Sequence, residues 1–297
     1  MRLVELITEW FTDPYTSMFM RRALLAAVLV GVVAPVVGVW IVLRRLAYLG
    51  DAMSHSLLAG VAGAYLWGWS ITGGALVAGL VMAGLVGLLG AHPRLRPDAI
   101  IGVVGTALFA LGVILVSART NTIGVDLSSF LLGQITTVTE GDLAANAALA
   151  VVVVAAIGWF FADLRHATFD PTHAALVGVP VVALGFGLLA VLAVAIVVSL
   201  QTVGLLMSVA MLVNPAATAR LVTSRVSTMT TAAVGFGVGS AVVGLTASYH
   251  LSSPPGATVA LTGVITLAAV FLASYPRRRG HTHAAHSGNS TQFAPSP

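Results

Sequence analysis

The sequence PVVALGFGLLAVLAVAIVVSLQTVGLLMSVAMLVNPAATA fills residues 180–219 and is apolar almost throughout. A helix needs only about 20 residues to cross the hydrocarbon layer of a bilayer. The tract is therefore too long for one crossing, and the polar side chains of Ser199, Gln201 and Thr202 mark the one place for a turn. We predict two transmembrane helices here.

The rest of the chain has the same character. Of its 297 residues, 58% are hydrophobic and only 8% are charged, whereas about a quarter of the residues in soluble domains are charged. Apolar stretches of membrane-spanning length leave no room for a separate soluble domain. We predict one all-α membrane domain over residues 17–275, a bundle of about nine helices at 17–43, 52–69, 71–90, 100–117, 142–162, 180–199, 202–219, 228–248 and 257–274.

The basic residues give this bundle an orientation. With the N-terminus outside and the C-terminus in the cytoplasm, ten of the 14 arginines lie on the cytoplasmic side and four outside, which agrees with the positive-inside rule. If residues 180–219 crossed only once, Arg220, Arg225 and the arginines at 277–279 would move outside. We therefore prefer nine crossings to eight.

The two ends of the chain differ from the bundle. Residues 1–16 mix acidic and apolar side chains, which favours a short amphipathic helix on the membrane surface over a cleavable signal. Residues 276–297 are rich in Gly, His, Ser, Asn, Gln and Pro, a composition that cannot bury enough apolar area to fold. We expect a disordered cytoplasmic tail, whose histidines either bind metal weakly or have no such role: His281, His283 and His286.

Missing residue types exclude several functions. The chain has no cysteine, so thiolate metal ligands and disulfides are excluded. It has no lysine, which a P-loop ATPase needs to bind phosphate. The arginines are scattered over short loops and form no patch for nucleic acid. We expect no enzyme activity and no resident cofactor, and any ATP hydrolysis must come from another subunit.

The segment LGDAMSHS, Leu49–Ser56, carries the candidate metal ligands. Asp51 and His55 are four residues apart, so on a helix they share one face. A carboxylate at the centre of a membrane helix costs about 2.5 to 3.5 kcal/mol on insertion scales, and such residues usually have a function. Carboxylate and imidazole together suit Mn²⁺, Fe²⁺ or Zn²⁺.

One helix supplies too few ligands for a closed metal site. Two copies of the chain, packed with these faces opposed across a shared pathway, would supply two aspartates and two histidines. An alternative without metal remains open, in which Asp51 caps the N-terminus of the second membrane helix and His55 packs internally.

The same segment resembles the G-D-A-[LM]-S-H-[AS] signature of the permeases of bacterial manganese/zinc/iron ABC importers. In that family the Asp and His bind metal on the translocation path, which implies this role for Asp51 and His55. Asn214 departs from the family, where an apolar residue or Thr is usual. Other segments resemble the family in the same order, namely 100–117, 126–127, 131–133, 202–204, 215–220, 248–250 and 255–258.

The resemblance implies a function and a set of partners. The chain would be the permease of an ATP-driven importer of a divalent transition-metal ion, Mn²⁺ or Zn²⁺ before Fe²⁺, and would act as a homodimer in the lipid of the bacterial inner membrane. Its partners would be an ATP-binding cassette ATPase and an extracytoplasmic metal-binding protein.

Residues 169–178, FDPTHAALVG, indicate a short capped helix between two membrane helices. Asp170 suits the N-cap, Pro171 the first helical position, and Gly178 the end. The residues alone fit an ordinary loop helix equally well. The family resemblance implies that this is the coupling helix, which contacts the ATPase through residues that include Ala174.

Two pairs of residues in the later helices have more than one interpretation. Met207 and Met211 are four apart and either gate the pathway or fill gaps between helices. Gly235 and Gly239 have the small-xxx-small spacing of close helix packing, and we assign them no nucleotide role.

Two other transporter classes remain as alternatives. A permease for a metal chelate or corrinoid would need a wide lining without ion-binding ligands, which Asp51 and His55 argue against. A proton-coupled secondary transporter would use Asp51 as a proton relay, and its uptake would follow the proton gradient without an ATPase.

Overall fold

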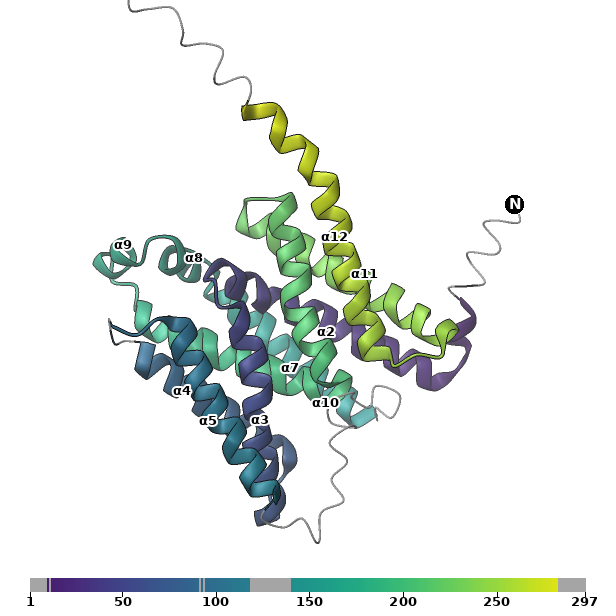
Figure 1. The fold of residues 1–297 in the computed structure, drawn as a ribbon, viewed down its shortest axis with the longest axis horizontal. Helices are drawn as coiled ribbons and strands as arrows, with labels where there is room; N and C mark the ends of the chain where they lie inside the picture. Colours follow the sequence, from purple (N-terminus) through teal and green to yellow (C-terminus); the bar gives the residue numbers. More distant parts are fainter. Residues whose placement is uncertain (1–9, 11, 91, 93, 118–139, 283–297) are drawn as a thin grey trace, which may run out of the picture.

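The computed structural model describes residues 10, 12–90, 92, 94–117 and 140–282. Every regular element in these ranges is a helix (Figure 1), so the predicted all-α class is confirmed. Most of the predicted surface helix at 1–16, the family-like segments at 126–133 and the last part of the tail lie outside the described residues.

The described elements begin with a short 3-10 helix, η1, at Asp13–Thr16. The α-helices that follow are α2 (Met18–Leu43), α3 (Ala47–Trp67), α4 (Ile71–Gly90), α5 (Pro97–Ser117), α7 (Glu140–Trp159), α8 (Phe161–Phe169), α9 (Pro171–Leu176), α10 (Val181–Val222), α11 (Val226–Leu251) and α12 (Pro255–Thr282).

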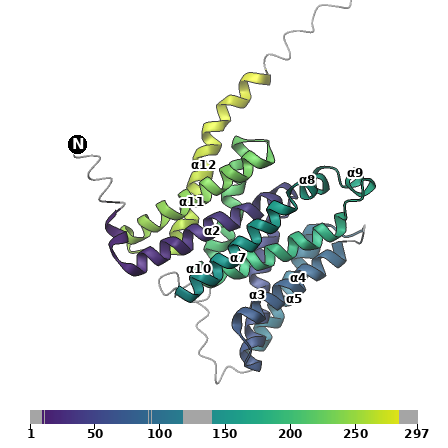
Figure 2. The same cartoon turned by 180° about the vertical axis from the view of Figure 1, so that it is seen from behind.

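The helices form two groups joined by a central layer. Helices α3, α4 and α5 lie side by side on one side of the molecule, and α11 and α12 pack together on the other. Helices α2, α7 and α10 lie between them, as the opposite view also shows (Figure 2). Within this layer α2 and α10 are the best buried: Trp40 and Ile41 of α2 and Leu192 and Leu212 of α10 are all enclosed.

Helix α10 is two helices joined at a break. Gly204 has φ 79° and ψ 174°, a conformation that is essentially restricted to glycine. Two apolar segments of membrane-spanning length lie in α10, Val181–Leu200 and Val203–Val222, and Gly204 lies at the start of the second. The two predicted helices are therefore present, although the break lies beyond the expected polar turn at Ser199–Thr202.

Seven helical segments of the described chain are long and apolar enough to cross a membrane, or eight if the bent pair of α7 and α8 counts as one span. Helix α7 starts two residues before the predicted helix at 142–162. A 60° bend between Trp159 and Phe161 then separates α7 from α8. Helix α3 has 21 residues and is not among these spans. The nine crossings stay a prediction, because the count depends on α3, the helix with the candidate metal ligands.

Helix α12 continues to Thr282, and the disordered tail expected from residue 276 stays a prediction. Arginines occupy positions 277–279 of this extension. Residues 283–297, with two of the three tail histidines, lie outside the described part of the chain.

Glycines set the closest helix contacts, although not at the expected pair. A Cβ atom at Gly237 of α11 would lie 2.4 Å from the backbone oxygen of Gly31 in α2, whereas one at Gly235 or Gly239 would meet no atom within 4 Å. The prediction that Gly235 and Gly239 mediate close packing within the chain is therefore wrong. The spacing of Gly235 and Gly239 indicated a glycine-rich helix. Which face of α11 contacts α2 depends on how the two helices pack.

This contact gives a stability prediction. We expect Gly237→Leu to lower the free energy of unfolding by about 1 to 3 kcal/mol, because the side chain has to push α11 away from α2. Gly239→Leu, two residues away on open surface, is the matched control and should change stability by less than about 0.5 kcal/mol. Thermal unfolding of the purified permeases measures both, and equal losses of stability would contradict the assigned contact.

Candidate metal-binding site

Asp51 lies inside α3 and does not cap it. The N-cap is Leu46, which makes no side-chain capping bond, and the helix begins at Ala47. Asp51 is therefore more than one turn past the start, and the alternative that treats it as a helix cap is wrong. The predicted boundary at residue 52 was late because an acidic residue was taken for the edge of the apolar stretch.

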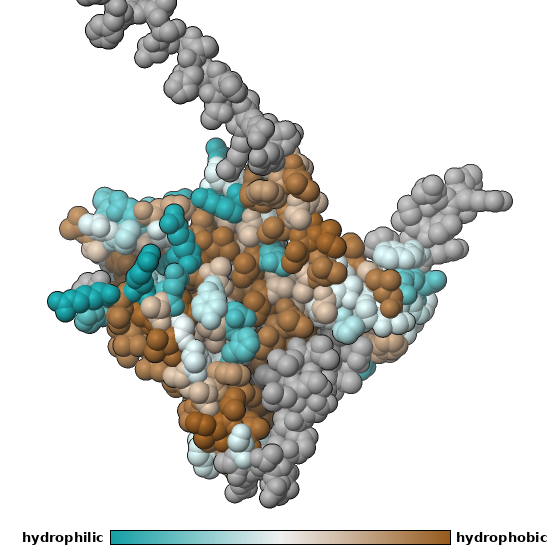
Figure 3. Space-filling model, viewed as in Figure 1, coloured by the Kyte–Doolittle hydropathy of each residue, from teal (hydrophilic) through white to brown (hydrophobic). Residues whose placement is uncertain are grey.

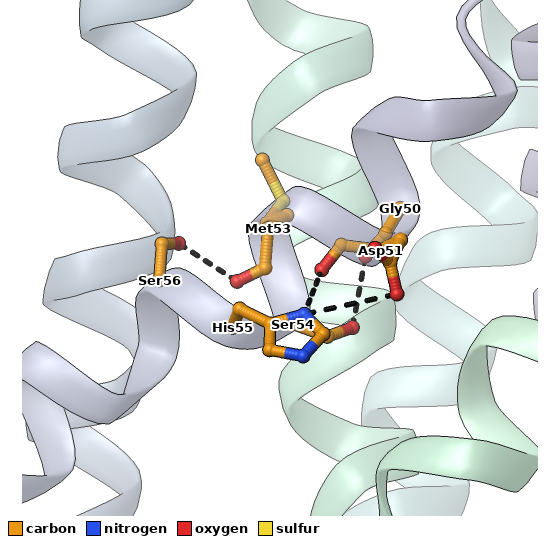
Figure 4. Close-up of polar contacts among 6 residues, drawn as sticks. All are labelled: Gly50, Asp51, Met53, Ser54, His55 and Ser56. Atoms are coloured by element: carbon orange, nitrogen blue, oxygen red, sulfur yellow. Dashed lines mark hydrogen bonds and ion pairs between the residues drawn. The ribbon is translucent and has the colours of Figure 1, made fainter. Parts of the chain in front are cut away.

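The imidazole of His55 lies directly beside Asp51 (Figure 4). Its Nδ1 is 2.9 Å from the backbone oxygen of Asp51 and 3.7 Å from the carboxylate Oδ1. A carbonyl oxygen only accepts hydrogen bonds, so Nδ1 carries the hydrogen and donates it. In a neutral imidazole with this tautomer, the lone pair of Nε2 can bind a metal ion, with the Asp51 carboxylate on the same face of the helix.

Neighbouring hydroxyl groups on α3 are already hydrogen-bonded to its backbone. Ser54 donates to the oxygen of Gly50 at 2.8 Å, and Ser56 donates to the oxygen of Met53 at 2.7 Å. Both serine side chains are buried. The two ligand candidates therefore stand apart from the other polar groups of this segment, because their side chains point outward while the serines turn inward.

Asp51 and His55 line an open groove of about 250 Å³ between α3 and α5. Its other wall includes Gly102, Thr106 and Phe109 of α5. The ring of Phe109 meets the imidazole edge to face, at 5.7 Å between centroids and 81° between planes. Figure 3 shows polar residues gathered over the upper parts of α3 and α5, with apolar surface beside and below them.

Small residues allow the helices to form this groove. A Cβ at Gly105 would lie 3.0 Å from the Cβ of Ala52, and one at Gly112 would lie 2.7 Å from the backbone nitrogen of Ala59. Larger side chains at these positions would separate α5 from α3. The close contact thus places Phe109 against His55.

One chain presents only part of a metal site. The side chains of His55 and Asp51 are 41% and 43% exposed, and no cluster of three or more His, Cys, Asp or Glu residues occurs in the described ranges. The pair can bind a divalent cation on one side and leaves its other side open. That ligands from a second copy close the site stays a prediction.

Three larger side chains that line the groove were not predicted. They are Tyr48 of α3 and Thr106 and Phe109 of α5. Tyr48 could have been found from its spacing, because it lies three residues before Asp51 and seven before His55, on the same helix face. The two α5 residues carry no such signal, since their position beside His55 results from helix packing.

The segment that follows α8 has the predicted caps. Asp170 accepts a hydrogen bond from the backbone nitrogen of His173 at 2.9 Å, and Pro171 starts α9. Gly178 has φ 87°. The nitrogen of Val179 donates to the oxygen of Ala174 at 3.0 Å, which closes the helix in the manner of a Schellman motif.

The exposed surface of this segment differs from the expected one. Ala174, the predicted contact with the ATPase, is 1% exposed and packs within the chain. The neighbouring Leu176 and Val177 are 83% and 65% exposed. Large exposed apolar side chains are typical of a surface that contacts another protein. Neither Leu176 nor Val177 was predicted from the sequence as a contact residue.

The possible gate residues lie in the core. Met207 and Met211 are both buried, and neither lines the groove of Asp51 and His55. Packing between helices accounts for their burial. Their role as a gate stays a prediction, which now requires these side chains to become exposed in another conformation.

Known proteins are similar to this chain over nearly its whole length. The model of a family described as the ABC 3 transport family matches residues 16–275. The chain belongs to the ABC 3 transport family. It is 37% identical over 268 residues to the manganese transport system membrane protein MntC of Halalkalibacterium halodurans, covering 90% of this chain and 91% of that protein.

Two further comparisons agree with this assignment. A protein of Haemophilus influenzae named as a probable iron transport system membrane protein is 31% identical over 253 residues, covering 85% of this chain and 93% of its own. A structure described as PsaBC from Streptococcus pneumoniae in complex with Fab matches with a TM-score of 0.78 at 31% identity, and the match covers 89% of this chain and 95% of that one.

The resemblance read from Leu49–Ser56 is thereby confirmed. This chain is a multi-pass membrane permease subunit of a metal-ion ABC importer, in which the ATPase is a separate subunit. Its relatives differ in the metal named for them, manganese in one and iron in another.

Proposed function

We propose that this permease imports Mn²⁺ or a chemically similar divalent ion through a pathway lined by Asp51 and His55. The observation that carries the proposal is the placement of both side chains in the groove between α3 and α5, with the Nδ1 of His55 hydrogen-bonded to the backbone oxygen of Asp51. Carboxylate and imidazole ligands suit Mn²⁺ and Fe²⁺, the metals named for two relatives. Zn²⁺ fits the same ligands.

The second half of the site comes from a second copy of the chain. Two permeases with their α3 helices opposed supply two carboxylates and two imidazoles. The open side of each half-site supports this arrangement, because both side chains are more than one third exposed in the single chain. The site binds the transported ion only transiently, and the protein holds no resident cofactor.

Counting α3 as a membrane span gives the number of crossings and the orientation of the chain. Seven apolar segments, the bent pair of α7 and α8, and α3 together give nine crossings. The N-terminus is then outside and the C-terminus in the cytoplasm, with ten of 14 arginines on the cytoplasmic side. An extracytoplasmic binding protein delivers the ion to the outer face.

The ATPase subunit transmits its movement to the permease through α9. Asp170, Pro171 and Gly178 fix the ends of this helix, which lies on the cytoplasmic side in the nine-span topology. Leu176 and Val177 contact the ATP-binding cassette subunit, and Ala174 supports them from inside. Nucleotide-driven movement of the ATPase then alternates access to the metal site.

Uptake of radioactive manganese in proteoliposomes tests the function against the rival transporter classes. With permease, ATPase and binding protein present, we expect uptake that requires ATP and persists when a protonophore collapses the proton gradient. Uptake without the ATPase that disappears with the protonophore would instead establish a secondary transporter. Transport of a metal chelate but not of the free ion would establish the chelate permease.

A further inference from the structure

A second cavity lies away from the metal groove, at the ends of four helices. It has a volume of about 320 Å³ and opens to the surface. Its wall includes Arg44 at the C-terminus of α2, Gly90 at the end of α4, Pro97 at the start of α5 and Val182 at the start of α10. The cavity therefore lies where membrane helices end, at the level of the lipid headgroups in a bilayer.

The interior of this cavity is apolar apart from Arg44. Side chains from three helices line it, including Val86 of α4, Ile100 and Ile101 of α5, and Phe186 and Leu189 of α10. Its volume is at the lower end of the range of about 300 to 1,000 Å³ that is usual for ligand pockets. The lining suits a hydrocarbon chain and offers little to a polar ligand beyond one positive charge.

The guanidinium of Arg44 is incompletely satisfied. Its Nε donates to Thr168 Oγ1 of α8 at 3.1 Å, but its buried Nη2 has no hydrogen-bond partner in the described part of the chain. No acidic side chain of the described ranges forms an ion pair with it. Burial lowers the pKa of Arg44, because desolvation disfavours the charged form. An anion placed beside Arg44 would offset this cost.

We propose that this cavity binds one anionic phospholipid, with its phosphate at Arg44 and an acyl chain between α4, α5 and α10. Charge complementarity selects the headgroup, because guanidinium and phosphate form strong charge-assisted hydrogen bonds. The apolar walls select a lipid over free phosphate. Arg45, Arg94 and Arg96 belong to the same helix ends and make this edge of the bundle positive, and basic pockets between membrane helices on the cytoplasmic side are known to bind anionic headgroups.

The bound lipid would connect parts of the chain that are distant in sequence. Arg44 follows α2 directly, and its hydrogen bond to Thr168 reaches the last turn of α8, just before α9. A phosphate that holds the guanidinium in place thus stabilises the position of α8 against α2. The site would make the stability of this region depend on the charge of the surrounding lipid.

Native mass spectrometry of the full-length permease in detergent tests the proposal. Purified permease is titrated with phosphatidylglycerol, with phosphatidylcholine of the same acyl chains, or with inorganic phosphate. We expect one tightly retained phosphatidylglycerol per chain, bound about tenfold or more strongly than phosphatidylcholine. Inorganic phosphate alone should neither bind measurably nor compete.

Three variants separate the site from general effects of charge. Arg44→Gln should lose the preference for phosphatidylglycerol, whereas Arg45→Gln, which removes the adjacent exposed charge, should keep it. Val86→Phe fills part of the cavity without touching the arginine and should also lose the lipid, so the proposal can be tested even if Arg44→Gln fails to fold. Equal retention of both lipids by the natural protein, unchanged retention by Arg44→Gln or Val86→Phe, or competition by free phosphate would overturn it.

Discussion

Uptake of Mn²⁺ by the reconstituted transporter should fall at least about 100-fold when Asp51 or His55 is replaced by alanine, with the permease still assembled. Loss of a residue that only supports a metal ligand typically costs 10- to 100-fold, and loss of a ligand itself should cost no less. Each substitution removes one ligand from both halves of the proposed dimer site. Uptake of radioactive manganese measures the loss, and gel filtration of the purified complex checks assembly.

Two controls make this experiment specific to the groove. Asp98→Ala removes a carboxylate from the first turn of α5, outside the residues that line the groove, and should transport normally. Phe109→Leu removes the edge-to-face contact with His55 but no ligand, and should lower uptake much less than His55→Ala. Normal uptake by both alanine variants would refute the metal site. Equal losses in Asp98→Ala would show that the effect does not belong to this groove.

Leu176→Asp should remove most of the affinity of the permease for its ATPase and thereby most of the ATP-dependent uptake. The side chain is 83% exposed on α9, and the few residues that anchor the centre of a protein contact contribute about 2 kcal/mol or more each, about 30-fold in affinity. A carboxylate would also have to be desolvated on binding. Co-purification of the ATPase and ATP-dependent uptake measure the two effects.

Val222→Asp is the matched control for this substitution. Val222 is also an exposed apolar residue, at the end of α10, and the nine-span topology puts it on the same side of the membrane as α9. Its replacement should leave the ATPase bound. If Leu176→Asp binds the ATPase normally, or if both variants lose it equally, α9 is not the specific contact.

The boundaries of most helices were predictable because bilayer length and side-chain polarity determine them locally. The predicted helices at 17–43 and 71–90 agree with α2 and α4 to within one residue. The predicted boundaries were wrong where a polar side chain does not mark the end of a helix. The acidic Asp51 suggested an edge of the apolar stretch, whereas α3 begins at Ala47, and the bend between α7 and α8 falls inside the predicted helix at 142–162. The polar side chains of Ser199, Gln201 and Thr202 predict a break a few residues before Gly204. The observed break instead uses a backbone conformation that only glycine adopts readily.

The sequence by itself determined the all-α membrane class, the Asp51 and His55 pair and the caps of α9, because each depends on residues within a turn or two of one another. Only the tertiary structure decided that Phe109 meets His55, that Gly237 and not Gly239 contacts α2, that Ala174 is buried while Leu176 is exposed, and that Arg44 lies beside an apolar cavity. These facts depend on how each helix is rotated against its neighbours. That rotation is fixed by the fit of side chains from distant parts of the chain, and the period of a single helix does not contain it.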